Sequence, residues 1–171
     1  MSRIVTFQGV KMALAGRRIR IGGRAPDFKL VSRDFKDVSF SDFKGKTLVI
    51  NSFPSLDTPV CDLQVKEFNK RAAGISPDVV VIGVSKDLPF AQARFCALNG
   101  VENEVILSDY KSSSFGLNYG LLIREINLLA RGSLVIDRNG KIRYMQVAGE
   151  VTHPLDFDEV FSALQEVLKN G

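Results

Sequence analysis

Two apolar segments rich in β-branched residues are the feature that most constrains the fold of this chain. Residues 48–53 have the sequence Leu-Val-Ile-Asn-Ser-Phe, and residues 79–84 have the sequence Val-Val-Val-Ile-Gly-Val. Continuous apolar segments of this length are typical of strands that are covered on both faces. They therefore predict two central strands of a sheet, with other elements packed against each side.

Helices are predicted between and after these strands. An apolar stripe at helical spacing begins at Cys61 and predicts a helix between the two strands, and a similar stripe predicts a closing helix over residues 157–169. A third helix is expected from Pro89 to Leu98. Proline suits the first turn of a helix, and the following Asn99-Gly100 supplies a C-terminal stop.

Turn signals predict two hairpins, one at the N-terminus and one before the closing helix. Gln8-Gly9 separates two short apolar stretches and predicts an N-terminal β-hairpin. Asn139-Gly140 predicts another hairpin, between residues 134–136 and 142–147. The order β-α-β-α, followed by more sheet and a closing helix, indicates an α/β layer fold. A length of 171 residues fits a single domain over 1–171.

The composition leaves few residues for chemistry. About 45% of the residues are apolar and 25% are charged, as in an ordinary globular protein. Two cysteines are too few for a disulfide scaffold or a four-cysteine zinc site. The single histidine, His153, nearly excludes a Ser–His–Asp triad or a multi-histidine metal site, and its polar surroundings predict a surface position. The candidates for catalysis are therefore Cys61 and Cys96.

Charge and hydropathy predict neither nucleic-acid binding nor a membrane association. The formal net charge of +4 is a mild basic bias. Arg17-Arg18-Ile19-Arg20 gathers basic residues, but its alternation indicates the solvated face of a strand. The longest wholly aliphatic stretch, residues 79–82, is far too short to cross a bilayer. The apolar residues 12–15 precede the arginines, which is the reverse of a signal peptide, so a cytoplasmic protein with reduced thiols is expected.

Cys61 occupies a position that favours a reactive thiolate. Thr58 is a good helix N-cap and Pro59 fits the first helical position, so Cys61 lies in the first turn. Unpaired backbone N–H groups and the positive end of the helix dipole stabilise a thiolate there. Asp57 and Asp62 oppose this effect, so a nearby cation would help, and the spacing does not say which one. The alternative is that Cys61 is a small apolar residue on the inner face of the helix.

Several motifs resemble one family of proteins. The pattern Pro54-x-x-x-Thr58-x-x-Cys61 resembles the active-site signature of the peroxiredoxins. Residues 87–96 resemble the resolving-cysteine segment of the bacterial thiol peroxidases, which are atypical two-cysteine peroxiredoxins, and residues 5–9 and 129–137 also match. The resemblance covers nearly the whole chain in the right order. It implies a thioredoxin-like fold, with a central mixed β-sheet flanked by helices and an N-terminal β-hairpin.

The resemblance also implies roles for four residues around one thiolate. Cys61 corresponds to the peroxidatic cysteine, which attacks the O–O bond of a hydroperoxide and becomes a sulfenic acid. Thr58 corresponds to the threonine whose hydroxyl bonds the peroxide and the sulfur. Arg131 corresponds to the arginine that places positive charge beside the thiolate, and Pro54 to the proline that shapes the pocket and limits water access. The alternatives are a plain helix cap for Thr58 and a surface ion pair for Arg131.

Cys96 corresponds to the resolving cysteine of the family. It would attack the sulfenic acid and form an intramolecular Cys61–Cys96 disulfide, which thioredoxin would then reduce. Its place near a helix C-terminus favours a protonated thiol. A disulfide needs Cα atoms within about 7 Å, so helix ends that hold the thiols farther apart would have to unwind. The resemblance implies no metal, haem, flavin or nucleotide cofactor. Without the resemblance, Cys96 would be interpreted as a core residue.

The apolar segment 120–129 has two interpretations. It can pack on the core of its own domain, or it can form an exposed patch that a second subunit covers. Thiol peroxidases resemble each other in forming homodimers whose interface lies near the active site, so the family resemblance implies such an interface here. The second interpretation is therefore favoured, and a homodimer is expected.

Two other functions remain as alternatives. A thioredoxin-like disulfide exchanger would use a C-x-x-C pair, which the sequence lacks. A non-enzymatic binding protein on the same fold could use residues 17–24 to contact an acidic partner. In that case Cys61 would be dispensable, whereas a peroxidase depends on it.

Overall fold

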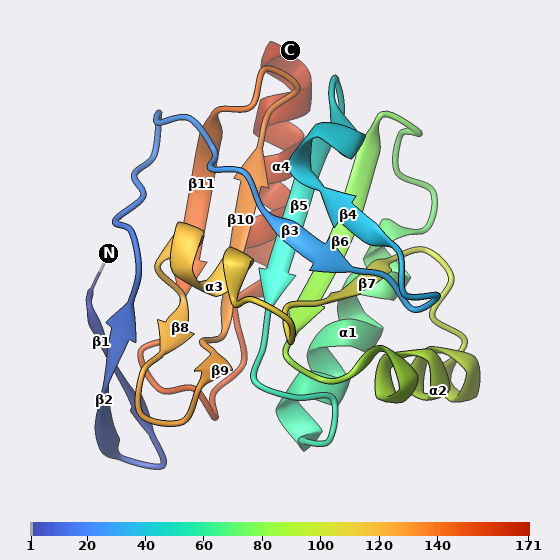
Figure 1. Cartoon of the computed structure of the whole chain (residues 1–171). Helices are drawn as coiled ribbons and strands as arrows, with labels where there is room; N and C mark the ends of the chain where they lie inside the picture. The colour runs from blue at the N-terminus through green and yellow to red at the C-terminus, as the bar shows by residue number, and fades with distance from the viewer. Residues whose placement is uncertain (1) are drawn as a thin grey trace.

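A mixed seven-stranded sheet forms the centre of the computed structural model, which describes residues 2–171. The strand order is β11-β10-β5-β6-β7-β3-β4 (Figure 1). The strands β5, β6 and β7 are parallel to one another, and the remaining neighbours are antiparallel. The bounds of these strands are β3 (Lys29–Val31), β4 (Asp37–Ser39), β5 (Thr47–Ser52), β6 (Val79–Ser85), β7 (Val105–Ser108), β10 (Gly132–Ile136) and β11 (Ile142–Val147).

A smaller antiparallel sheet lies beside the central one and contains the N-terminal hairpin. Its order is β1-β2-β8-β9. The hairpin turns at Gln8 and Gly9, which have φ angles of 50° and 82°, as a tight two-residue hairpin turn requires. The predicted N-terminal hairpin is therefore confirmed. The bounds of these strands are β1 (Ile4–Phe7), β2 (Val10–Ala15), β8 (Leu122–Ile123) and β9 (Leu128–Leu129).

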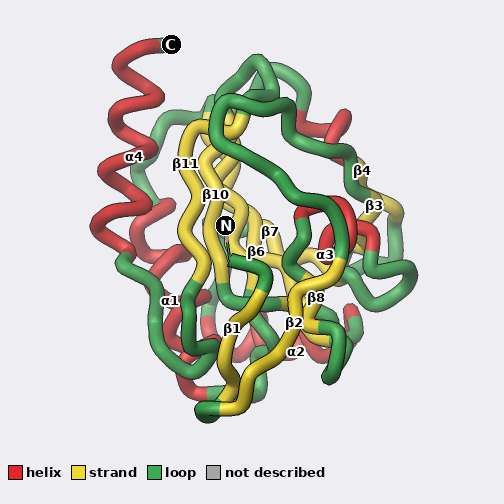
Figure 2. The backbone as a smooth tube through the Cα atoms, turned by 90° about the vertical axis from the view of Figure 1, so that its left-hand side faces the viewer, coloured by secondary structure: helices red, strands yellow, loops and turns green. Residues whose placement is uncertain are grey.

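Helices and the small sheet cover opposite faces of the central sheet. Figure 2 shows α1 and α4 on one side, and β1, β2, β8 and α3 on the other. The α1 and α4 face buries Val49, Val81 and Val135 against Phe68 and Leu164. Alternate residues of the same strands enter a larger apolar cluster on the opposite face, as the two-residue repeat of a strand requires. The helices are η1 (Phe40–Phe43, a 3-10 helix), α1 (Pro59–Ala72), α2 (Pro89–Asn99), α3 (Ser114–Tyr119) and α4 (Phe157–Asn170).

The predicted central strands and helices are confirmed. The segments predicted as central strands form β5 and β6, which pair in parallel with Leu48 opposite Val80. The helix predicted from Pro89 ends at Gly100, which has a φ of 62° and whose N–H donates to the Cys96 carbonyl. None of the helices within residues 2–171 has the length and apolar character needed to cross a membrane.

The strand expected at Arg17–Arg20 is wrong. This segment has no regular secondary structure and belongs to neither sheet. Arg17 N donates to the Leu117 carbonyl and Gly22 N donates to the Ile142 carbonyl, so its backbone is held by single bonds to two different neighbours. Ile21 is 60% exposed, although a half-buried strand would turn it inward. The alternation there reflects a connecting segment that crosses the surface.

The exposed apolar patch expected at residues 120–129 is also wrong. Leu121, Ile123 and Leu129 are completely buried in the protein's own core. The segment forms the short strands β8 and β9, and β8 pairs with β2 through Leu14 and Ile123. The interpretation as a segment packed on its own domain is therefore correct. The expected homodimer stays a prediction that this segment no longer supports.

Glu150 ties the N-terminal hairpin to the rest of the structure. Its Oε1 accepts hydrogen bonds from Gly9 N at 2.8 Å and from Thr6 Oγ1 at 3.1 Å. Its Oε2 accepts from Thr152 N at 2.9 Å. The backbone bonds from Thr152 and Gly9 are the main reason that the pKa of Glu150 falls to about 2, from an ordinary value of 4.5.

Replacing Glu150 should therefore make the protein less resistant to denaturant in a pH-dependent way. A pKa lowered in the folded state contributes stability that is complete above the unfolded pKa and is lost as the pH falls through the folded one. We expect Glu150→Gln to lower the free energy of unfolding at pH 7, and the deficit to shrink between pH 4.5 and 2. Urea unfolding at several pH values measures this. Glu166→Gln, on an exposed part of α4, is the control, and a deficit independent of pH would contradict the assignment.

Candidate active site

Cys61 lies in the first turn of α1, as predicted from its caps. Thr58 adopts an extended conformation at the N-cap, and its Oγ1 accepts a hydrogen bond from Cys61 N at 3.3 Å. Pro59 is the first helical residue. The Cys61 side chain is completely buried. Since α1 follows β5, this thiol lies beyond the carboxyl end of a central parallel strand, where α/β folds place their sites.

Arg131 is the cation beside Cys61. It directly precedes β10, and its Nη2 donates to Cys61 Sγ at 3.2 Å. The same guanidinium donates from Nη1 to Gln64 Oε1 at 2.8 Å and from Nε to the Val151 carbonyl at 2.7 Å. Only 2% of Arg131 is exposed, so the alternative of a surface ion pair is wrong. A guanidinium in this position stabilises negative charge on the sulfur.

A chain of buried polar side chains continues from Arg131. Gln64 Nε2 donates to Asn51 Oδ1 at 2.9 Å, and Asn51 Nδ2 donates to Glu104 Oε1 at 2.8 Å. Burial raises the pKa of Glu104 to about 8, against the opposing effect of the Asn51 hydrogen bond. The sequence did not single out Gln64, Asn51 or Glu104. The available signal was Asn51, a polar residue in the middle of a strand that is otherwise apolar.

Pro54 lies in the loop that joins β5 to α1. It is buried and follows Phe53, whose N–H donates to the Val84 carbonyl at 3.1 Å. The next residues are held by Asp87, which accepts from Ser55 Oγ at 2.7 Å and from Leu56 N at 2.9 Å. The loop before Thr58 is thus attached to the segment between β6 and α2.

Cys96 lies in α2 and belongs to the same apolar cluster as Cys61. The cluster also contains Phe53, Leu56, Val65, Val101 and Ile106. Both cysteines are free thiols and both are buried. Burial raises the pKa of Cys96, while the smaller effects of Arg33 and Glu104 lower and raise it respectively. A protonated Cys96 was expected from its helix position, and the burial of the thiol raises its pKa in the same direction.

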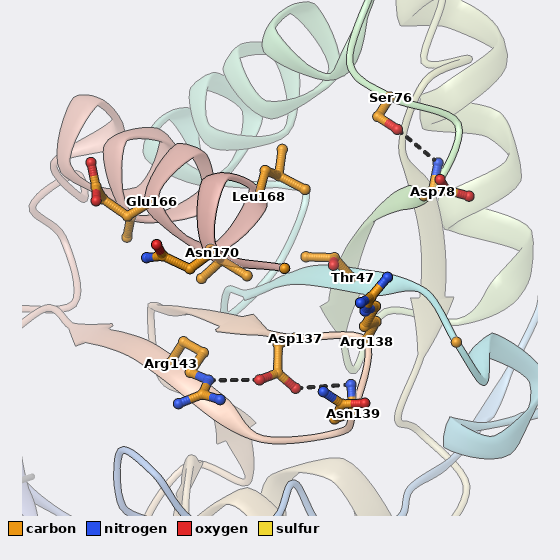
Figure 3. A pocket seen from close by; sticks show the side chains of 14 residues that line it. Thr47, Ser76, Asp78, Asp137, Arg138, Asn139, Arg143, Glu166, Leu168 and Asn170 are labelled. Atoms are coloured by element: carbon orange, nitrogen blue, oxygen red, sulfur yellow. Dashed lines mark hydrogen bonds and ion pairs between the residues drawn. The ribbon is translucent and has the colours of Figure 1, made fainter.

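One cavity lies away from both thiols. Its volume is about 1040 Å³, and its lining includes Thr47 at the start of β5, the β10–β11 turn at Asp137 and Asn139, and the last residues of α4 (Figure 3). Cys61 follows the opposite end of β5, so this cavity is separate from the cysteine site. His153 is exposed, as expected. Within residues 2–171, no three His, Cys, Asp or Glu side chains are grouped to bind a metal ion.

The fold and the comparisons with known proteins define a thioredoxin-like protein of the Redoxin family, which matches residues 20–164. Thiol peroxidases from Bacillus subtilis and Staphylococcus haemolyticus are 40% and 42% identical to this chain and cover 96% and 95% of it, with 98% of each relative covered. A peroxiredoxin-like protein from Aquifex aeolicus has a TM-score of 0.92 and 38% identity, with 98% of both chains covered. The chain therefore belongs to the thiol peroxidase family and is a peroxiredoxin-type peroxidase.

A thiol peroxidase from Chromobacterium violaceum has the same fold, with a TM-score of 0.87, 22% identity and complete coverage of both chains. The family resemblance and the thioredoxin-like fold predicted from the sequence are confirmed. A peroxidase is favoured over the two alternative functions, disulfide exchange and non-enzymatic binding.

Arg131→Met should destabilise the protein strongly. The change leaves two buried acceptors, Gln64 Oε1 and the Val151 carbonyl, without their donor. An unsatisfied buried polar group costs about 1–3 kcal/mol, so for two such groups we expect a loss of roughly 2–6 kcal/mol in the free energy of unfolding. Urea unfolding measures this loss. Arg124→Met, at an exposed arginine, is the control. Equal stabilities for the two variants would show that the buried bonds of Arg131 contribute little.

Proposed function

We propose that this peroxidase reduces hydrogen peroxide and alkyl hydroperoxides with Cys61 as the attacking thiolate. The sulfur forms an S–O bond as the O–O bond breaks, and the leaving oxygen takes a proton to become water or an alcohol. The sulfur is oxidised to a sulfenic acid. The observation that carries this proposal is the 3.2 Å bond from Arg131 Nη2 to Cys61 Sγ at the start of α1. This bond places a positive charge against the sulfur, which attacks as a thiolate.

Thr58 and Pro54 complete the proposed site. The Thr58 hydroxyl accepts from Cys61 N and donates to the Ser55 carbonyl at 3.2 Å. It can redirect its proton to a peroxide oxygen, which gains negative charge as the O–O bond breaks. Arg131 can donate to the same developing charge. Pro54, buried in the adjoining loop, has no backbone N–H and limits water access.

Cys96 is the proposed resolving cysteine. Its sulfur attacks the Cys61 sulfenic acid, so that an S–S bond forms, the S–O bond breaks and water leaves. The shared apolar cluster of the two thiols supports this pairing. Thioredoxin supplies the two electrons that reduce the disulfide by thiol–disulfide exchange. The proposed setting is the cytoplasm, where both thiols return to the reduced state, and the proposed assembly is a homodimer.

Substitution of either cysteine should separate the two half-reactions. In an assay with hydrogen peroxide, thioredoxin, thioredoxin reductase and NADPH, we expect turnover for wild type and none for Cys61→Ser. Cys96→Ser should consume one equivalent of peroxide and then stop, because its sulfenic acid has no thiol partner. Mass spectrometry of oxidised wild type should find the Cys61–Cys96 disulfide within one chain. Full turnover by Cys61→Ser would overturn the assignment of the peroxidatic cysteine.

Thr58 variants should separate capping from catalysis. We expect Thr58→Val to slow the oxidation of Cys61 by about 100-fold, because a hydroxyl donor to the developing oxyanion is lost. Thr58→Ser keeps the hydroxyl and should stay within about threefold of wild type. Thr58→Asn retains a side-chain cap without the hydroxyl. If Thr58→Asn reacts as fast as Thr58→Ser, Thr58 acts only as a cap.

Oxidation should loosen both helices locally. Cys61 and Cys96 lie within helical turns, since Asp62 N donates to the Thr58 carbonyl and Val101 N to the Cys96 carbonyl. We expect faster hydrogen exchange in the first turn of α1 and the last turns of α2 after stoichiometric peroxide is added. The Cys96→Ser variant, which cannot form the disulfide, is the control. Identical exchange before and after oxidation would show that the disulfide forms without unwinding.

A further inference from the structure

Glu104 is an acid buried in the core close to the proposed active site. It is 2% exposed and lies just before β7. Its Oε1 occupies space above β6 that exists because residue 83 is glycine, since a Cβ there would lie 2.7 Å from that oxygen. No hydrogen-bond partner for its Oε2 is found among residues 2–171. An apolar residue would avoid the cost of burying this group, so general core stability does not explain it.

The hydrogen bonds between Glu104 and Cys61 run in one direction. Arg131 has donors only and stands at one end, and Glu104 Oε1 accepts at the other end whether the carboxyl is ionised or carries its proton on Oε2. The amides of Gln64 and Asn51 lie between them, each with its oxygen toward Arg131 and its nitrogen toward Glu104. Turning either amide over would place two donors or two acceptors in contact. The acceptor at Glu104 therefore matches the orientation that Arg131 requires.

The backbone acceptors of the Asn51 and Gln64 side-chain amides do not by themselves satisfy every amide proton. Asn51 Nδ2 also donates to the Ile82 carbonyl at 3.0 Å, and Gln64 Nε2 to the Ser52 carbonyl at 3.1 Å. The backbone thus holds one proton of each amide group. Glu104 accepts the second proton of Asn51, and without it that buried N–H has no acceptor. The Asn51 side chain could then turn, and the positions of Gln64 and the guanidinium would be less restricted.

We propose that Glu104 is a positioning residue for the peroxidase reaction, which holds the Arg131 guanidinium against Cys61 Sγ through Asn51 and Gln64. The proposal rests on the proposed role of Cys61 as the attacking thiol. Glu104 does not touch the sulfur and takes no part in bond making. It acts on the alignment of the cation, and therefore on the share of Cys61 that is thiolate and on its rate of attack.

Three variants test the proposal in a Cys96→Ser background, where Cys61 is the only thiol. Glu104→Gln keeps an acceptor oxygen, Glu104→Leu removes it, and Glu102→Leu alters an exposed neighbour as the control. The rate of Cys61 oxidation by hydrogen peroxide is measured by rapid quenching and mass spectrometry, and the thiolate fraction by absorbance at 240 nm. We expect Glu104→Leu to react about tenfold more slowly with a smaller thiolate fraction, since one hydrogen bond is lost. Glu104→Gln and Glu102→Leu should stay within about twofold of the parent.

A double-mutant cycle tests the route of the effect. Gln64→Met breaks the same chain nearer to Arg131. If Glu104 acts through Gln64, adding Glu104→Leu to Gln64→Met should change the rate by less than about twofold. If the two substitutions slow the oxidation of Cys61 independently, so that their rate effects multiply in the double variant, the proposal is overturned. It is also overturned if Glu104→Leu folds and Cys61 is oxidised at the rate of the parent. If Glu104→Leu does not fold, Gly83→Ala displaces the carboxylate from the other side and should give the same slower rate.

Failure of the positioning role can be told apart from failure of the proposed function. If peroxide oxidises Cys61→Ser as it oxidises wild type, Cys61 is not the attacking thiol and the proposed function falls. If Cys61 is oxidised normally in every Glu104 variant, only the positioning role is overturned.

Discussion

A buried guanidinium must find acceptors for its N–H groups, because each one left without a partner costs free energy. Arg131 meets this requirement with three acceptors from two parts of the chain: Cys61 Sγ and Gln64 Oε1, one turn apart in α1, and the Val151 carbonyl after β11. The position of the cation therefore depends on the packing of α1, β10 and the segment after β11 together. Removing any one of these supports leaves the same charge buried with fewer partners.

The sheet order explains how residues 61 and 131 come together. β5 pairs antiparallel with β10, and Ser52 lies opposite Gly132. The end of β5, which leads into α1, is therefore beside the start of β10, which Arg131 precedes. The chain of polar side chains lies on the face of β5 and β6 that α1 covers. On that face the paired Val49 and Val81 are followed, two residues further along each strand, by the paired Asn51 and Gly83. At the site, polar side chains thus occupy positions that are apolar elsewhere on the same face of a regular sheet.

The central strands, α1 and the place of Cys61 were predictable because each depends on local signals: apolar runs, helical spacing and an N-cap. The segments at residues 17–20 and 120–129 were not, because their structure depends on partners far along the chain. The same alternation occurs in a strand and in an irregular connection between strands. An apolar segment has the same sequence whether its own core or a second subunit covers it. Asn51 and Gly83 were visible breaks in apolar strands. Their link to Glu104 exists only in three dimensions.

The cluster that Cys61 and Cys96 share with Phe53, Leu56, Val65, Val101 and Ile106 bears on the redox potential. Cys61 and Cys96 are free thiols, both buried in this cluster. If the helices rearrange to form the proposed disulfide, any packing that they lose raises the free energy of the disulfide form relative to the dithiol form. Each 1.4 kcal/mol that favours the dithiol raises the potential of the couple by about 30 mV. If the helices give up contacts in this core to form the proposed disulfide, that disulfide is easier to reduce, so that hydrophobic packing would help to return both cysteines to free thiols.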